Sequence, residues 1–192
     1  MEMTKYLMPA LLAAVVSSGC AWVPQTARLQ LTPEISPATV GQGVTVAVRI
    51  TDRRTSKTIG HRGVDSENAS ITTQQNVTAL FEEKIVQGLE RKGFTAGRYE
   101  GQPGRTLTVE IRRIDYKTDM EFWKGIVLTE AVLDAVVLKD DVKFEQTYTG
   151  QRKDTTVEAP SAKTNDRLIN GAISEAVQKL FEDHNLLRFL AE

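Results

Sequence analysis

The sequence predicts an α+β fold in which an antiparallel sheet carries two amphipathic helices packed on one face. Three segments alternate apolar and polar residues, as half-buried strands do, and two longer segments repeat apolar residues every three or four positions, as amphipathic helices do. The strand-like segments are grouped apart from the helical ones, which favours this arrangement. The 192 residues are 41% hydrophobic and 26% charged, which is ordinary for a globular protein.

The first strand is predicted over residues 44–50, where the sequence VTVAVRI places four aliphatic side chains on one face. Residues 52–70 are polar and broken by glycines, so we expect an exposed loop with a short strand near Ile71. Residues 76–92 repeat apolar side chains at helical spacing, and a cation followed by Gly93 is typical of a helix end. They therefore form the first predicted helix.

The second strand follows a glycine-rich turn. Apolar residues alternate over 107–111, and the next apolar residues, Ile114 and Tyr116, stand in the opposite phase. One extra residue in this strand would return both halves to the same buried face. The sequence therefore predicts a β-bulge at Arg112 and Arg113.

Two more strands and a second helix complete the predicted domain. Residues 126–138 fit helical spacing in part, but Val and Leu dominate them and a clear strand follows, so we interpret them as a strand. The polar sequence KDD at 139–141 predicts a hairpin turn into the alternating strand 142–148. A long amphipathic helix is predicted over 165–183, and a short amphipathic tail over 186–190.

The N-terminal stretch LLAAVVSSGCAW contains Cys20, the one cysteine of the chain. Lys5 precedes an apolar run about half as long as the roughly 20 residues of a membrane-spanning helix, and small residues follow the run. This arrangement is typical of a secretory signal peptide. SSGC resembles the lipobox of bacterial lipoproteins, in which the cysteine is lipidated and the preceding peptide is removed. Ser17 stands where a lipobox usually carries Leu or another aliphatic residue.

The lipobox implies a division of the chain into a lipoprotein signal, a tether and a domain. Residues 1–19 are the predicted signal peptide, residues 20–41 the lipidated cysteine with a flexible tether, and residues 42–192 a single α+β domain. Two or more acyl chains, such as palmitate, anchor a protein stably. Ala21 follows the cysteine instead of Asp, which in Gram-negative lipoproteins implies the outer membrane and its periplasmic face.

Several features together resemble the YajG-like lipoproteins. These are the lipobox, the proline-bearing tether, the strand VTVAVRITDRR, the helix end ERKGF and the closing helix INGAISEAVQKLF. The resemblance covers essentially the whole chain by order and length of elements. It implies an outer-membrane lipoprotein with no known catalytic residues. The lipopolysaccharide-assembly lipoproteins are similar in size and layout, but this chain lacks their long polar C-terminal tail.

The sequence offers little for catalysis or metal binding. His61 and His184 are far apart and have no carboxylate at helical spacing, so they form no metal signature, and no serine stands in a Gly-x-Ser-x-Gly setting. Asp140 and Asp141 are explained by a hairpin turn. We therefore expect no enzyme activity, no metal and no cofactor. A net charge of −1 lacks the basic excess of a nucleic-acid-binding protein.

One candidate contact for an anionic lipid or glycan is a basic cluster formed by Arg53, Arg54, His61 and Arg62. A solvated loop is the simpler interpretation of these residues, and we favour it.

The sequence MEFWKGIV contains a second candidate contact. Met120, Phe122 and Trp123 come just before the strand 126–138, where a hairpin would bring them to the edge or end of the sheet. Aromatic residues and Met are enriched in the cores of interfaces, so these residues are a candidate partner contact. The alternative is that they cap the hydrophobic core. That interpretation is simpler, and we expect Trp123 to be buried.

Three classes of function remain open. The favoured class is a non-catalytic envelope interaction or accessory module, anchored by Cys20 to the periplasmic side of the outer membrane, with a protein or glycan partner. The second is a carrier that binds a lipid or glycan in a groove between sheet and helix. The third, an enzyme, lacks a convergent set of reactive residues.

Overall fold

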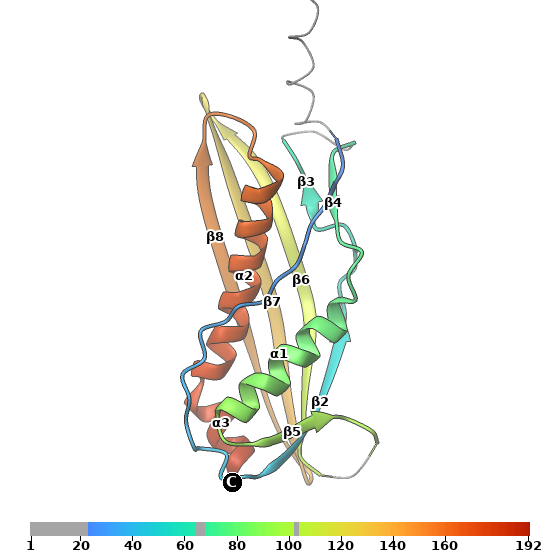
Figure 1. The fold of residues 1–192 in the computed structure, drawn as a ribbon, viewed down its shortest axis with the longest axis vertical. Coiled ribbons are helices and arrows are strands. Elements are labelled where there is room, and N and C mark those ends of the chain that lie inside the picture. The colour runs from blue at the N-terminus through green and yellow to red at the C-terminus, as the bar shows by residue number, and fades with distance from the viewer. Residues whose placement is uncertain (1–22, 64–67, 102–103) are drawn as a thin grey trace, which may run out of the picture.

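The computed structural model describes residues 23–63, 68–101 and 104–192, which form a mixed sheet and three helices. The strands are β1 (Gln25–Thr26), β2 (Thr45–Asp52), β3 (Gly60–His61), β4 (Ser70–Thr72), β5 (Thr95–Arg98), β6 (Thr106–Glu121), β7 (Lys124–Lys139) and β8 (Val142–Thr156). The helices are α1 (Val77–Arg91), α2 (Ala162–Glu182) and α3 (His184–Ala191). All three helices lie on one face of the sheet (Figure 1), whereas the sequence predicted two helices there and a short amphipathic tail. None of them is long and apolar enough to cross a membrane.

β6, β7 and β8 form a long antiparallel meander. Ile111 of β6 lies opposite Leu133 of β7, and Ile114 lies opposite Ala131, so both pairs face the same buried side. The register shifts between Ile111 and Arg113, which confirms the predicted β-bulge. The interpretation of residues 126–138 as a strand is also confirmed, because they lie within β7.

The sheet is mixed, so the prediction of an antiparallel sheet is wrong for its other half. β2 lies between β5 and β6 and is parallel to both, with Val48 opposite Arg98 on one side and Leu107 on the other. β3 is parallel to β6, and β1 is parallel to β4. The physical reason lies in the connections. After β2 the chain returns through α1 to the start of β5, and such a crossover joins parallel strands.

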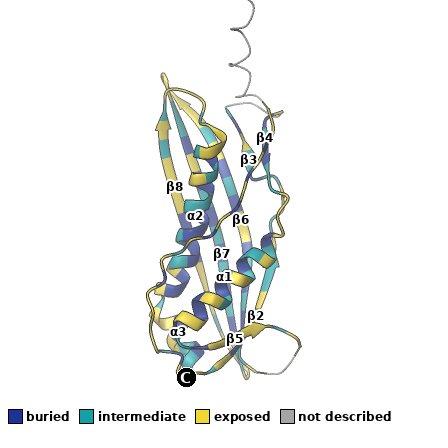
Figure 2. Ribbon diagram, in the orientation of Figure 1, coloured by how far each residue is buried: buried dark blue, intermediate teal, exposed yellow. Residues whose placement is uncertain are grey.

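The helices begin and end at capping residues. The Asn76 side chain accepts a hydrogen bond from the Ala79 backbone N–H at the start of α1, and Gly93 has a φ of 86° just beyond its end. Ser161 caps α2 in the same way. Each such cap satisfies backbone groups that have no partner within the helix. Buried residues line the sheet-facing sides of α1 and α2 (Figure 2).

Residues 25–35, the N-terminal arm, are part of the domain. The inward-facing apolar side chains of this arm join the core: Ala27, Leu29, Leu31 and Ile35. The prediction of a flexible tether up to residue 41 is therefore wrong, and so is a domain boundary at residue 42. The predicted signal peptide 1–19 and Cys20 lie outside the described residues.

Side chains of α2 hold the N-terminal arm in place. The backbone N–H groups of Gln30, Thr32 and Glu34 donate hydrogen bonds to the side chains of Asn170, Ser174 and Gln178, at 2.8, 2.9 and 3.4 Å. These acceptors are four residues apart and so lie on one face of the helix. The arm thus runs along α2 in one fixed path across the front of the molecule (Figure 1).

Candidate functional site

The β6–β7 hairpin ends in a group of exposed apolar side chains. Phe122 is 96% exposed, Trp123 68% and Met120 55%, and Val157 in the loop between β8 and α2 is 69% exposed. We call these four residues the apolar tip. The expectation that Trp123 is buried is wrong, because the hairpin extends beyond the helices that cover the rest of the sheet (Figure 1).

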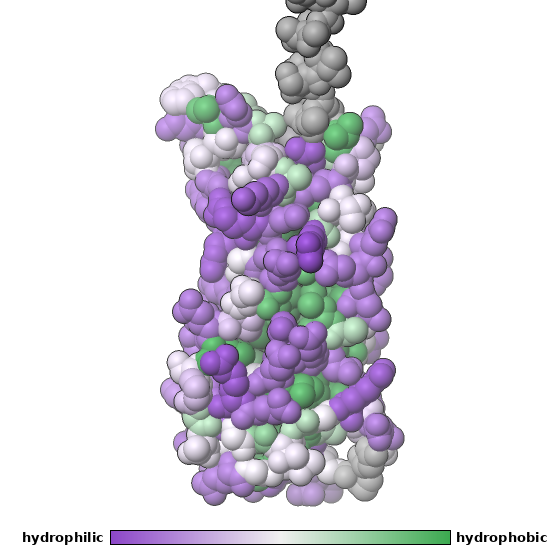
Figure 3. Space-filling model, viewed as in Figure 1, coloured by the Kyte–Doolittle hydropathy of each residue, from purple (hydrophilic) through white to green (hydrophobic). Residues whose placement is uncertain are grey.

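On the face shown in the space-filling view, this end is mostly white and purple with small green areas, and the larger apolar areas lie in the middle and lower part of the face (Figure 3). A hollow of about 280 Å³ lies beside the apolar tip. Its apolar walls come from β6, β7 and the loop between β8 and α2, with Met120, Ile126, Val127, Val157 and Pro160 among them. Met120 and Val157 belong both to the tip and to the lining of the hollow, which also includes the charged Asp119 and Glu158.

The backbone of Phe122 is unusual for its residue type. Its φ is 56°, in the left-handed region that bulky side chains rarely adopt. Asp140 occupies the corresponding position in the β7–β8 hairpin with a φ of 52°, and Asp tolerates this region well. Because the Phe122 side chain is almost fully exposed, no packing within the domain compensates for this conformation.

Lys124 lies next to the aromatic side chains of the apolar tip. Its Nζ is 4.9 Å from the centroid of the Trp123 ring, within the range of a cation–π contact. Glu121 ends β6 on the other side of the turn. These two opposite charges flank the turn, and the carboxylates of Asp119 and Glu158 lie at the adjoining hollow.

The N-terminal arm starts at the same end of the molecule as the apolar tip (Figure 1). The Gln25 side chain donates hydrogen bonds to the Ala162 carbonyl at 3.0 Å and to the Asp166 carboxylate at 2.9 Å, both in the first turns of α2. It also accepts a hydrogen bond from the buried Asn165 side chain at 2.9 Å. Since the loop before α2 supplies Val157 to the tip, these contacts fix the start of the arm near that end.

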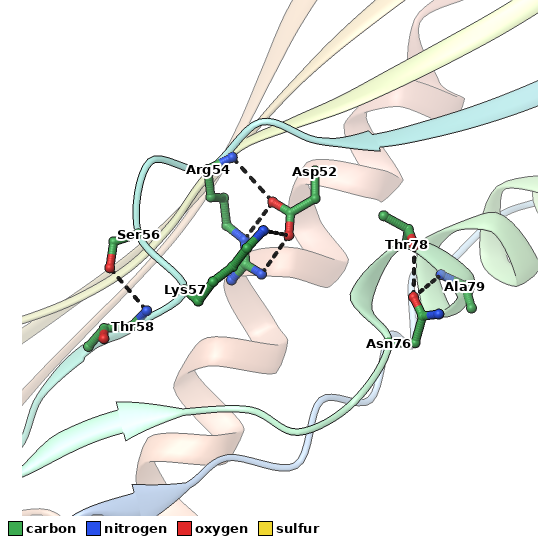
Figure 4. A network of polar contacts seen from close by, with 8 residues as sticks. All are labelled: Asp52, Arg54, Ser56, Lys57, Thr58, Asn76, Thr78 and Ala79. Atoms are coloured by element: carbon green, nitrogen blue, oxygen red, sulfur yellow. Dashed lines mark hydrogen bonds and ion pairs between the residues drawn. The ribbon is translucent and has the colours of Figure 1, made fainter.

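The predicted basic cluster is not brought together. Arg53 and Arg54 follow β2, whereas His61 and Arg62 belong to the region of β3. The Arg54 side chain is only 4% exposed, and its Nε lies 2.9 Å from the Asp52 carboxylate. Lys57 contacts the same carboxylate at 2.6 Å (Figure 4). The hydrogen bonds from Arg54 hold the pKa of Asp52 well below its usual range.

Arg53 and Arg62 also have partners of their own. Arg53 lies 3.5 Å from the Glu110 carboxylate, and Arg62 donates to the Pro160 carbonyl at 3.3 Å. Anion binding by the cluster stays a prediction, and the arrangement fits structural ion pairs better than one anion site. In the described part of the chain, no group of three or more His, Cys, Asp or Glu residues is placed to hold a metal ion.

Sequence reasoning found three of the four residues of the apolar tip and missed Val157. An isolated valine in the polar sequence DTTVEAPS carries little signal, because it joins the tip only through the fold. The unusual backbone of Phe122 was also missed. The predicted strands end near Tyr116 and begin at residue 126, and only the structure shows that Phe122 and Trp123 alone form the turn, where Gly, Asn or Asp is common.

Comparison with known proteins gives a family and a fold. The sequence matches an uncharacterized lipoprotein family over residues 32–191, and no curated protein matches it. The crystal structure of a Xanthomonas campestris protein from a family of unknown function is similar, with a TM-score of 0.58 and 16% identity, covering 83% of this chain and 92% of that one. A putative neuraminyllactose-binding hemagglutinin homolog from Helicobacter pylori has a TM-score of 0.49 and 9% identity, covering 86% and 96%. At these identities the first similarity shows the fold alone, and the second is too low to support an argument.

Proposed function

Because the chain belongs to the uncharacterized lipoprotein family, as its YajG-like features predicted, we propose that it is a lipid-anchored, non-catalytic interaction module of the bacterial envelope. Cys20 carries the anchor, and the domain stands on the periplasmic face of the outer membrane. The SSGC sequence supports the anchor and Ala21 supports the outer membrane. The observation that carries the interaction role is the apolar tip.

The apolar tip has the properties of a contact surface. Its four side chains are exposed, and large exposed apolar patches on a soluble domain usually mark interaction sites. The fold gains no packing from Phe122, and the backbone conformation there is unfavourable for it. A residue that serves neither packing nor local conformation is best explained by what it contacts outside the domain.

The alternative function, a lipid or glycan carrier, requires a groove between the sheet and a helix. At Gly150 of β8, a Cβ atom would lie 2.0 Å from the Ala172 carbonyl oxygen and 2.5 Å from the Ala176 backbone nitrogen of α2. The backbone of α2 therefore rests directly on the strand there and leaves no space for a ligand. This contact favours the interaction module over the carrier.

Replacement of Cys20 tests the anchor. Cys20→Ser should abolish incorporation of labelled palmitate and should release the protein from membranes, because no other cysteine is present. Ser17→Leu is a matched control that restores the usual aliphatic residue of the lipobox, and it should keep both labelling and membrane attachment. A wild-type protein that takes up no palmitate would refute the anchor.

Replacement of the histidines tests the non-catalytic role. His61→Ala and His184→Ala should leave the phenotype of a deletion strain fully complemented at normal protein abundance, because neither residue belongs to a metal-binding group in the part of the chain that the structure describes. Loss of complementation by one variant at normal abundance would favour an enzyme or a metal site.

A further inference from the structure

We propose that the apolar tip inserts into the surface of the same bilayer to which Cys20 anchors the chain. This proposal rests on the anchoring proposed above. It adds that the apolar tip contacts the interfacial region of the lipid bilayer and not a second protein. The membrane is then bound at two points, one covalent and one formed by the fold.

The first argument is the short reach of the chain between the anchor and the domain. Gln25 is five residues beyond Cys20, and a fully extended chain spans at most about 3.6 Å per residue, or about 18 Å in all. From Gln25 onward the arm is held by hydrogen bonds to α2. A free tether up to residue 41 would have allowed any side of the domain to face the membrane. The fixed arm allows only the end at which it starts.

The second argument is the position of the apolar tip. It lies at the end where the arm starts (Figure 1). Val157 and Pro160 line the hollow together with Met120, and Ala162, two residues after Pro160, accepts the hydrogen bond from Gln25. The start of the arm and the apolar tip are therefore connected through residues 157–162, and both face the bilayer when the anchor is in place.

The third argument is the chemistry of the apolar tip. Tryptophan is enriched where membrane meets water, because its ring is apolar and its N–H remains able to hydrogen-bond. Lys124 beside Trp123 has a long apolar stem whose ammonium group can stay at the level of the headgroups. Lys124 is accompanied by Glu121 at the turn and by Asp119 and Glu158 at the hollow, so burial of apolar side chains, and not attraction to anionic lipid, is the driving force.

The fourth argument is the contrast with the opposite end of the molecule. There the β7–β8 turn presents Asp140 and Asp141, and the chain ends beside α3 (Figure 1). Two adjacent carboxylates are strongly disfavoured in a membrane interior. The exposed Leu138 and Val142 flank these two carboxylates, whereas at the other end Phe122 and Trp123 occupy the turn itself, so the tip is the end whose turn residues are suited to the lipid interface.

Quenching of Trp123 fluorescence tests the proposal in the full-length lipidated protein. Trp22→Phe leaves Trp123 as the one tryptophan of the chain. The protein is reconstituted in vesicles of phosphatidylethanolamine and phosphatidylglycerol that contain phospholipid brominated at shallow acyl positions. We expect the emission of Trp123 to shift to shorter wavelength and to be quenched, and a change in the share of phosphatidylglycerol to have little effect.

Two variants serve as controls. The combination of Trp22→Phe, Trp123→Phe and Asp141→Trp moves the reporter to the opposite end, where we expect no quenching and no shift. Phe122→Asn, combined with Trp22→Phe, removes an apolar side chain from the tip and introduces a residue that tolerates the left-handed backbone conformation of the turn. It should weaken insertion about tenfold, the effect of leaving one large apolar side chain in water.

The outcomes separate failure of the anchor from failure of insertion. If palmitate is not incorporated and the wild type does not stay on membranes, the anchor is wrong and the proposal falls with it. If the protein is anchored but Trp123 is quenched no more than the reporter at position 141, insertion alone is wrong. A photo-cross-linker can be placed at position 122 in cells. If it yields one discrete protein adduct and no lipid adduct, the tip contacts a protein partner and the proposal of membrane insertion is wrong.

Discussion

The two hairpin turns of the long meander have similar backbones and opposite side-chain chemistry. Phe122 and Asp140 both have φ values near 50°, at the first position of their turns. At the β7–β8 turn the residue suits the conformation, because Asp adopts positive φ readily. At the β6–β7 turn a bulky aromatic residue adopts it while exposed to solvent. A local rule that is broken without a gain in packing points to function.

The surroundings of the two turns differ in the same way. Near the β7–β8 turn, α3 packs on the sheet, with the Phe189 ring centroid 5.5 Å from that of Phe144. Asp183 caps α3 and accepts a hydrogen bond from the Tyr148 hydroxyl at 2.6 Å, and Arg105 donates to the Leu190 carbonyl at 3.0 Å. This end contributes to stability. The end that carries the apolar tip instead exposes Phe122 and Trp123 at the turn itself.

The largest expected effect tests whether the α3 end stabilises the domain. Leu186 of α3 is fully buried, so Leu186→Ala should lower the free energy of unfolding by about 2–5 kcal/mol. Urea denaturation followed by circular dichroism measures the change. Leu138→Ala is a matched control, since Leu138 is exposed near the same end, and it should change stability little. If Leu186→Ala lowers the free energy of unfolding no more than Leu138→Ala does, the α3 end does not stabilise the domain as proposed.

Alkaline pH tests the same end through a buried hydroxyl. Burial, together with the hydrogen bond to Asp183, raises the pKa of Tyr148 far above its ordinary value. The fold favours the neutral hydroxyl, so this residue's contribution to the free energy of unfolding is fully present below a pH of about 10. Above that pH the free energy of unfolding falls by about 1.4 kcal/mol per pH unit for each such proton. Burial also raises the pKa of Tyr116, to about 12. Tyr148→Phe should therefore reduce, and not abolish, the alkaline loss of stability in urea titrations. An unchanged slope would contradict the role assigned to Tyr148.

Exchange of the turn residues tests the comparison directly. Phe122→Asn should raise the free energy of unfolding by about 1 kcal/mol, because Asn tolerates the left-handed conformation better than Phe. Asp140→Phe should lower it by about the same amount for the same reason. Thermal unfolding of both variants measures the two changes in stability. If Phe122→Asn destabilises the domain, the Phe122 side chain has a structural role and the interpretation of the tip changes.

The smallest expected effect is that of Trp123→Ala. Truncation of a buried tryptophan costs about 3–5 kcal/mol, whereas a change at an exposed position is usually within about 0.5 kcal/mol. Because Trp123 is 68% exposed, we expect the second value by differential scanning calorimetry. A loss of several kcal/mol would restore the original expectation that Trp123 caps the core.

The sequence by itself determined where the main elements lie and which face of each is buried. The periodicity of residues 76–92 and 165–183 predicted α1 and most of α2, and the change of phase at Arg112 and Arg113 predicted the bulge in β6. These features depend on neighbouring residues and on one buried face, so they can be read from a short window of sequence. The candidate contact at Met120, Phe122 and Trp123 was predicted in the same way, from residue type and a hairpin position.

Only the tertiary structure decided the direction of β2, the path of the N-terminal arm and the exposure of the apolar tip. An alternating pattern is the same for a parallel and an antiparallel strand, because it records burial and not the connection that returns the chain. The arm contains Pro33 and follows Pro24, and its hydrogen-bond partners are side chains about 140 residues away on α2. Trp123 is exposed because the helices end short of the hairpin, and that depends on the lengths and packing of elements distant in sequence.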